Sequence, residues 1–160
     1  MKEICFVDFY DSFSYNLVSD FYDLDVKLNL ISYEEFLNRE VDLSLPVLLG
    51  PGPGAISEYQ DFLNFFNKFY YKKVKTAGVC LGHQLLCFLN GSEIIQSKNI
   101  LHGQAEKLVL TSFWKVFLET KLDIVLVQRY NSLTVKTEGL SEKHLYSSSG
   151  ELMAILSDHY

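Results

Sequence analysis

A cysteine stands between two glycines in the stretch GVCLGHQ, residues 78–84, directly after an apolar run. The five residues from Gly78 to Gly82 have the form Gly-x-nucleophile-x-Gly, which in hydrolases places a nucleophile at a sharp turn from a strand into a helix. The glycines remove side chains that would collide with neighbouring backbone. The N-terminus of the following helix favours the thiolate of Cys80, and the N–H of Leu81 is expected to donate to an oxyanion. This pattern predicts a nucleophilic cysteine.

Two other interpretations of Cys80 exist. Cys80 can be a small buried residue of the hydrophobic core, as many cysteines are. Alternatively, Cys80 and His83, in the spacing Cys-x-x-His, can be two of the four ligands of a zinc site. The sequence contains no second Cys/His pair at comparable spacing, which disfavours zinc. The other two cysteines, Cys5 and Cys87, lie in apolar runs and are expected in the core. An odd number of cysteines argues against a disulfide framework.

Two more segments have residue types suited to binding. GPGPG, residues 50–54, predicts a rigid loop after a strand. It is either a tight connection with no further role or a second source of backbone N–H donors for a carbonyl oxygen. RYNSL, residues 129–133, follows an apolar run. Its serine and backbone groups either bind a small polar ligand or simply turn the chain.

The elements that must position these segments alternate along the first half. Apolar runs predict four strands, and periodic segments at 11–24, 58–71 and from 83 onward predict helices. The first helix is expected to have Phe13, Leu17 and Phe21 on one face, with Asp11 or Ser12 as its N-terminal cap. This order is typical of an α/β domain with a parallel sheet. Ligands bind at the carboxyl ends of such strands, which points to the turn after Asp8, the turn after Leu49 and the turn at Cys80. After Gly91 short strand candidates dominate, and we expect antiparallel hairpins added to the sheet edge.

Composition restricts the class of protein. The 160 residues are 48% hydrophobic and 21% charged, which indicates one globular domain, and the net charge of −6 disfavours nucleic acid and anionic membranes as partners. The first residues lack a signal-peptide core. No apolar run reaches the length of a membrane span. These features predict a cytoplasmic protein.

Six segments resemble one known family when taken together and in order. They are DFYDSFSYNL, LLGPGPG, GVCLGHQ, LHGQ, RYNSL and ELMAI, which run from Asp8 to Ile155. The chain is similar to the class I (triad-type) glutamine amidotransferases, and DSFSYNL narrows the match to the glutaminase subunits of anthranilate synthase and aminodeoxychorismate synthase. The resemblance implies a flavodoxin-like, three-layer α/β fold with an open, mostly parallel sheet and extra antiparallel strands in the second half.

The resemblance also implies roles for individual residues. Cys80 matches the nucleophile that attacks the side-chain amide of glutamine and forms a thioester. The oxyanion donors match Leu81 N–H and the backbone at Gly52. The matched substrate-binding residues are Gly52, Pro53, Gly54, Gln84, Ser132 and Leu133, the last two through their backbone. The family needs no metal or organic cofactor in this subunit. Its ammonia passes to a larger partner that binds chorismate and Mg²⁺, with contacts expected around Ser12 and around His102 and Gly103.

The chain departs from the family in one large respect. The family's catalytic base is a histidine in a His-Pro-Glu turn, and no His-x-Glu occurs among these 160 residues. We therefore expect a single amidotransferase domain over 1–160 that lacks the last strand, this turn and the final helix, with slow or no glutaminase activity. Smaller departures include Gln104 in place of lysine and Asn131 in place of histidine.

Three hypotheses follow from the sequence. The first is a glutaminase subunit of a chorismate-aminating synthase, impaired because the base is absent. The second is a catalytically silent homologue that binds and stabilises the synthase. The third, an unrelated thiol hydrolase on a similar fold, is disfavoured by DSFSYNL and RYNSL. The sequence does not distinguish the tryptophan pathway from the folate pathway.

Overall fold

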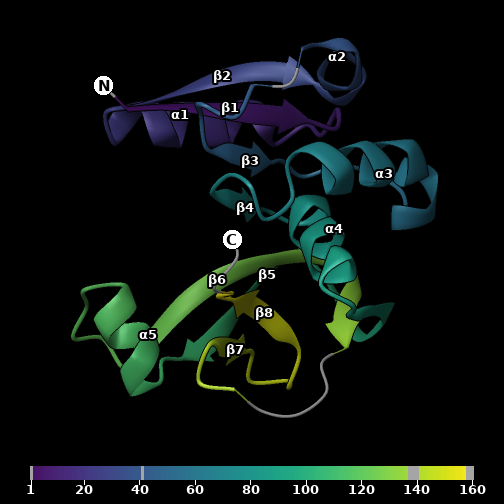
Figure 1. The fold of residues 1–160 in the computed structure, drawn as a ribbon. Helices are drawn as coiled ribbons and strands as arrows, with labels where there is room; N and C mark the ends of the chain where they lie inside the picture. The colour runs from purple at the N-terminus through teal and green to yellow at the C-terminus, as the bar shows by residue number, and fades with distance from the viewer. Residues whose placement is uncertain (1, 41, 137–140, 158–160) are drawn as a thin grey trace. The chain divides into compact units, whose positions relative to one another are not determined.

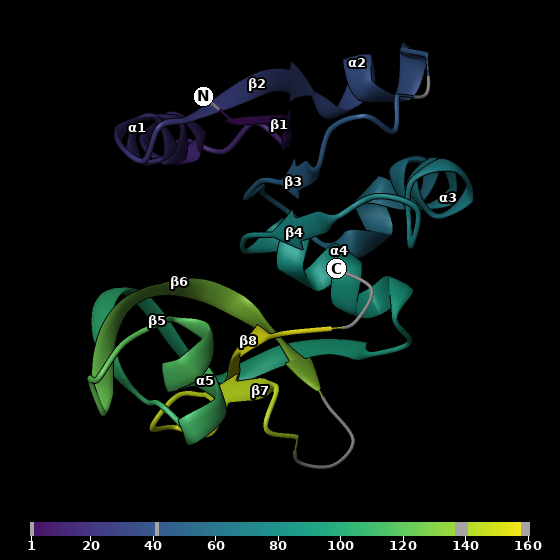
Figure 2. The same cartoon turned by 60° about the vertical axis from the view of Figure 1, so that its left-hand side comes forward.

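The computed structural model describes residues 2–40, 42–136 and 141–157. These residues form two compact units that divide after Asn90. The first unit carries β1 to β4 with helices α1 to α4, and the second carries β5 to β8 with helix α5 (Figures 1 and 2). The prediction of a single domain over 1–160 stays a prediction.

The first unit is built on a parallel four-stranded sheet with the strand order β2-β1-β3-β4. The strands are β1 (Lys2–Asp8), β2 (Val26–Ser32), β3 (Val47–Leu49) and β4 (Thr76–Gly78). Their registers place Val7 beside Leu49 and Leu49 beside Gly78, so the carboxyl ends of three strands meet at one edge. The predicted α/β fold with a parallel sheet is confirmed. The same edge carries the three turns at which the sequence predicted a ligand.

Helices cover both faces of this sheet. The helical elements are α1 (Ser14–Asp23), α2 (Tyr33–Asn38), the short 3-10 helix η1 (Ile56–Tyr59), α3 (Gln60–Phe69) and α4 (Leu81–Leu89). Because successive strand residues point to opposite faces, Val7 packs in a core with α2, α3 and α4. Phe6 packs on the other side, where Leu17 and Phe21 of α1 cover it. The first unit therefore has the three layers expected from the resemblance.

The start of α1 differs from the prediction. The helix begins at Ser14, and no side chain caps it. Asp11 instead accepts a hydrogen bond from the N–H of Phe13 at 2.8 Å, before the helix starts, and the side chain of Phe13 is 50% exposed rather than on the buried face. The buried hydroxyl of Ser14 donates to Asp8 and so ties the helix to the end of β1. The short helix α2, which the sequence did not predict, begins with a capping box between Ser32 and Glu35.

The second unit consists of two antiparallel pairs, β5 (Glu93–Val109) with β6 (Ile124–Lys136) and β7 (His144–Tyr146) with β8 (Leu152–Ile155). The prediction that these strands extend the parallel sheet is wrong, because in the described residues each pair forms a sheet of its own. Several short predicted strands also merge into the two long ones. Helix α5 (Ser112–Phe117) was not predicted. Its Trp114 packs with Leu108 and Leu145 in the core of this unit.

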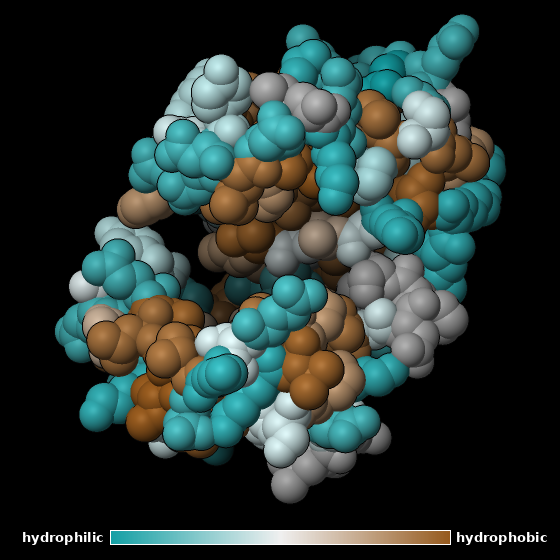
Figure 3. Space-filling view, turned by 90° about the vertical axis from the view of Figure 1, so that its left-hand side faces the viewer, coloured by the Kyte–Doolittle hydropathy of each residue, from teal (hydrophilic) through white to brown (hydrophobic). Residues whose placement is uncertain are grey.

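Some large apolar side chains stay at the surface of the second unit, among them Val116 and Leu126. Figure 3 shows a face of the molecule on which apolar and polar side chains alternate in patches. None of the described helices is long and apolar enough to cross a membrane.

Candidate active site

Cys80 lies at the junction between β4 and α4 and has an unusual backbone conformation. Its φ is 54° and its ψ is −109°, and it occupies the cap position of the helix. A positive φ is uncommon for any residue other than glycine and costs about 1–3 kcal/mol, which functional sites often store. This is the sharp strand-to-helix turn that the sequence predicted, and the side chain of Cys80 is exposed there.

The two glycines around Cys80 allow the backbone at the start of α4 to approach the neighbouring strands closely. A Cβ at Gly78 would lie 2.4 Å from the carbonyl oxygen of Gly82, and a Cβ at Gly82 would lie 2.2 Å from the carbonyl oxygen of Leu49. The N–H of Gly82 donates to the carbonyl oxygen of Gly50 at 3.1 Å. The first turn of α4 therefore rests directly on the end of β3. The prediction that glycines prevent backbone collisions here is confirmed.

The GPGPG loop follows β3 and lies against the start of α4. A Cβ at Gly52 would lie 2.5 Å from Cδ2 of Leu81. The hydroxyl of Tyr59 donates to the carbonyl oxygen of Pro53 at 2.9 Å, and Gly54 has a φ of 74°, which glycine adopts readily. These contacts fix the loop beside Cys80, as the sequence predicted for a rigid connection.

Two backbone N–H groups act on the Cys80 sulfur. Although Cys80 keeps exposed surface, the atoms packed around it partly dehydrate the thiol, which raises its pKa most, and the nearby Asp11 carboxylate raises this pKa further. Hydrogen bonds from the backbone of Leu81 and of Gly52 lower the pKa but do not outweigh burial. The backbone groups of Leu81 and Gly52 thus favour the thiolate, as expected, but partial dehydration disfavours the charged form more, and the net pKa is raised.

Gln84 and His83 lie on the first turns of α4. Gln84 is buried, and its N–H donates to the carbonyl oxygen of Cys80 at 3.1 Å. The ring nitrogens of His83 lie 3.7 and 3.8 Å from the sulfur of Cys87. Burial lowers the pKa of His83 and raises that of Cys87 to about 12. His83 therefore contacts a buried thiol one turn away along the helix, which agrees with a structural role.

The remaining predicted site residues, Ser132 and Leu133, lie on β6 in the second unit, whereas the others lie in the first. The hydroxyl of Ser132 lies 3.3 Å from Nε2 of His102, whose ring stacks on Tyr130 with the centroids 4.9 Å apart. Nδ1 of His144 lies 3.2 Å from the Tyr146 hydroxyl. The last histidine of the sequence, His159, lies outside the described residues.

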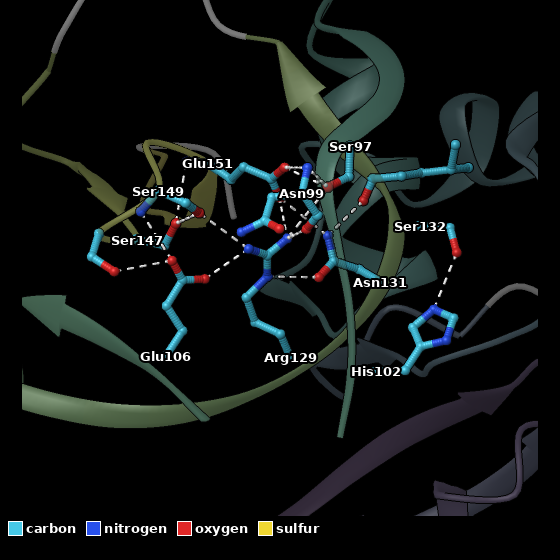
Figure 4. A network of polar contacts seen from close by, with 12 residues as sticks. Ser97, Asn99, His102, Glu106, Arg129, Asn131, Ser132, Ser147, Ser149 and Glu151 are labelled. Atoms are coloured by element: carbon cyan, nitrogen blue, oxygen red, sulfur yellow. Dashed lines mark hydrogen bonds and ion pairs between the residues drawn. The ribbon is translucent and has the colours of Figure 1, made fainter. Parts of the chain in front are cut away.

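A buried cluster of charges surrounds Arg129, also on β6. The guanidinium is fully buried and forms ion pairs with Glu106, at 2.7 Å, and with Glu151 (Figure 4). Burial raises the pKa of Glu106, but hydrogen bonds from Arg129, Ser149 and Ser148 outweigh this and lower it to about 2. Each charge in the cluster therefore has a partner, as burial requires.

This cluster was missed by the interpretation of the sequence, although a signal for it exists. Val125, Val127 and Arg129 alternate along β6, and the two valines pack toward the core of the second unit. A period of two places Arg129 on the same inward face. A charged residue at an inward position predicts a buried ion pair, and the two glutamates supply it. Within the described residues no group of three or more His, Cys, Asp or Glu side chains is arranged to hold a metal ion.

Comparisons with known proteins identify relatives over most of the chain. The family model described as Glutamine amidotransferase class-I matches residues 5–160. Anthranilate synthase component 2 of Pseudomonas aeruginosa is 30% identical, with 93% of this chain and 78% of the relative covered. The bifunctional protein TrpGD of Thermotoga maritima is 32% identical over 97% of this chain, which spans 27% of that relative's length. Aminodeoxychorismate/anthranilate synthase component 2 of Bacillus subtilis is 29% identical, with coverages of 95% and 79%.

Solved structures share the fold. A putative GMP synthase protein from Thermoplasma acidophilum has a TM-score of 0.77 at 17% identity, covering 99% of this chain and 79% of that one. A glutamine amidotransferase from Thermotoga maritima has a TM-score of 0.69, also at 17% identity, with coverages of 94% and 69%. The motifs, the turn at Cys80, the family match and the relatives agree, and the chain belongs to the class I glutamine amidotransferase family.

Proposed function

We propose that this chain is a glutaminase subunit that delivers ammonia to a chorismate-aminating synthase. The observation that carries the proposal is the placement of Cys80 at a strained turn with the backbone donors of Leu81 and Gly52 at its sulfur. A thiolate held in this way attacks a carbonyl carbon, and the two N–H groups stabilise the oxyanion that forms. We infer that glutamine is the substrate from the family match and from the component 2 relatives.

The reaction has two steps. The sulfur of Cys80 forms a bond to the amide carbon of glutamine, and the carbon–nitrogen bond then breaks, so that ammonia leaves with an added proton and a thioester remains. Water next attacks the thioester, which releases glutamate and restores the thiol. Gly52, Pro53, Gly54 and Gln84 are assigned to the glutamine pocket, and Ser132 and Leu133 to the amino-acid end of glutamine, on the family resemblance.

Both steps need a group that accepts and returns a proton, and the 160 residues contain no His-x-Glu. General-base assistance contributes roughly 10²–10⁴-fold to rate. The raised pKa of Cys80 increases the need for a base, because less thiolate is present at neutral pH. We therefore expect this polypeptide to be labelled at Cys80 by glutamine-like electrophiles but to hydrolyse glutamine slowly or not at all.

The partner is assigned as the chorismate-binding synthase component. The segments expected to contact it, around Ser12 and around His102 and Gly103, are both exposed on their own units, as a docking surface requires. A cytoplasmic location remains a prediction.

A chloroketone analogue of glutamine tests the site. Cys80 attacks its chloromethyl carbon and chloride leaves, so labelling needs no proton donor. We expect one label per chain, on Cys80, with a rate that saturates and that free glutamine slows. Chloroacetone, which has the same reactive group without the amino-acid end, is the matched reagent and is expected to show no saturation. Labelling by the analogue that neither saturates nor responds to glutamine would refute a glutamine site.

A second candidate function is a catalytically silent protein that binds and stabilises the synthase. The raised pKa of Cys80, which leaves less thiolate at neutral pH, favours it. Assays of synthase activity in the presence of this chain distinguish the two candidate functions. A functioning but impaired glutaminase predicts slow product formation from glutamine, whereas the silent homologue predicts no product from glutamine and stimulation with ammonium salts alone. Glutamine-dependent synthesis at the rate of complete amidotransferases would contradict our expectation of impairment.

A further inference from the structure

The GPGPG loop contains one of the two backbone donors assigned to the oxyanion, but regular strand pairing does not hold it. Strand β3 ends at Leu49, and in the described part of the chain no backbone–backbone hydrogen bond joins residues 51–54 to another segment. Gly52 lies between two buried side chains, because a Cβ there would lie 2.5 Å from Cβ of Phe9 and 2.5 Å from Cδ2 of Leu81. This close packing fixes where the loop lies, but the direction of its peptide groups needs a further restraint.

The hydroxyl of Tyr59 provides that restraint. Tyr59 ends the short helix η1, and its hydroxyl donates to the carbonyl oxygen of Pro53 at 2.9 Å. The ring of Pro53 fixes its φ, and the peptide bond between Gly52 and Pro53 is planar. From Cα of Gly52 to the carbonyl of Pro53 the backbone therefore keeps one soft dihedral, the ψ of Pro53. The hydrogen bond from Tyr59 holds this dihedral and acts directly on the residue next to Gly52.

Tyr59 is itself held in place. Its side chain is buried, and its ring packs edge-to-face on Phe9 and on Tyr33, with the ring centroids 5.3 and 5.4 Å apart. Burial raises the pKa of the Tyr59 hydroxyl most, and nearby carboxylates raise this pKa further, so the hydroxyl stays protonated and donates. The adjacent Glu58 accepts a hydrogen bond from the N–H of Ala55 at 2.7 Å. The far end of the loop is therefore held as well.

We propose that Tyr59 is a positioning residue whose hydroxyl holds the GPGPG loop so that the N–H of Gly52 is directed at the oxyanion formed when Cys80 attacks a carbonyl group. The proposal rests on Cys80 as the nucleophile of the proposed function. Every residue in it belongs to the first unit. A hydrogen bond from the backbone of Gly52 already acts on the Cys80 thiol, which agrees with this placement.

Tyr59→Phe tests the proposal, because it keeps the buried ring and removes only the donor to Pro53. Two reagents are compared. With p-nitrophenyl acetate, the thiolate of Cys80 attacks the carbonyl carbon and forms an oxyanion, and the carbon–oxygen bond to p-nitrophenolate then breaks and leaves a thioester. With iodoacetamide, the thiolate attacks a saturated carbon and iodide leaves, so no oxyanion forms. Because both reactions use the same thiolate, the ratio of their rates cancels changes in its amount or exposure.

We expect this ratio of acylation to alkylation to fall about tenfold in Tyr59→Phe, which is part of the ~10²–10³-fold that loss of an oxyanion donor costs. Tyr70→Phe is the matched control. Tyr70 is also buried in the core of the first unit, and its hydroxyl accepts a hydrogen bond from the N–H of Asp42 at 3.2 Å. The control is expected to lower Tm by a similar amount and to leave the ratio unchanged, since looser packing affects both reactions together.

The outcomes separate this proposal from the one on which it rests. If the wild type releases p-nitrophenolate no faster than Cys80→Ala, the nucleophile fails, and both the glutaminase function and this proposal fall. If the wild type is acylated at Cys80 and Tyr59→Phe keeps the wild-type ratio, only the positioning role is overturned. An equal fall of the ratio in Tyr70→Phe also overturns it. Thermal melts show whether the variants are folded, and failure of Tyr59→Phe alone to fold assigns Tyr59 to stability and overturns the positioning role.

Discussion

Replacing Gly82 by alanine is the most direct test of how the structure builds the turn at Cys80. The new Cβ would lie 2.2 Å from the carbonyl oxygen of Leu49 and 2.6 Å from its carbonyl carbon. Both are backbone atoms of β3, so no side chain can turn away, and α4 must move out by about 1 Å to reach ordinary contact. That movement strains the hydrogen bond from Gly82 to Gly50 at 3.1 Å.

The change in the free energy of unfolding is the sum of two effects. Overpacking of this kind costs about 1–3 kcal/mol, and alanine regains ~1 kcal/mol over glycine inside a helix. Because the collision is with backbone, we take the upper part of the range and expect a net loss of about 1–2 kcal/mol. For a chain of this size that lowers Tm by roughly 2–8 °C.

Labelling of Cys80 is the more sensitive assay. A shift of ~1 Å in a reacting group costs up to about 10²-fold in rate, so the maximal labelling rate with the glutamine chloroketone is expected to fall by at least tenfold. Gly91→Ala is the control, because its Cβ meets nothing within 4 Å, although its φ of 89° makes alanine unfavourable there. It is expected to lower Tm without affecting labelling. A Gly82→Ala chain that melts and reacts like the wild type would refute the close packing of α4 on β3.

Two further predictions concern charge. Asp11→Asn removes a carboxylate that raises the pKa of Cys80, so the pH profile for alkylation by iodoacetamide is expected to move to lower pH, and an unchanged profile would show that Asp11 does not act on the thiol. Glu106 has its pKa lowered from 4.5 to about 2 in the folded chain, so its ionised form stabilises the fold fully above about pH 4.5 and this contribution is lost as the pH falls toward 2. Urea unfolding across that range is expected to show a steeper loss of stability in the wild type than in Glu106→Gln, and parallel curves would contradict the assignment.

Much of the first unit could be predicted because its signals are local. The apolar runs indicated β1 to β4, and Gly78, Gly82 and the GPGPG loop marked the turn, since a glycine required by close backbone packing is visible in the sequence. The cap of α1 was mispredicted, because Asp11 and Ser12 are both suitable caps and only the bond from Ser14 to Asp8 selects where the helix starts. Helix α2 was too short to show a period.

The second unit was predicted less well because its structure depends on partners far apart in the chain. The long strands β5 and β6 contain a bulge and polar residues, so the sequence divides them into short runs. The carboxylates that neutralise Arg129 come from residues 23 positions before it and 22 positions after it, and only the fold brings them together.

Periodicity and glycine spacing are properties of neighbouring residues, and they were enough to predict the parallel α/β unit and to single out Cys80 as the proposed nucleophile. The residue order also shows directly that no His-x-Glu is present among the 160 residues. Two features became visible only in the folded chain: partial dehydration raises the pKa of the Cys80 thiol, and the Asn131 side chain joins the backbone of Leu133 to Arg129. The reason is physical, because dehydration and hydrogen bonding across a bulge depend on atoms that the chain brings together only when it folds.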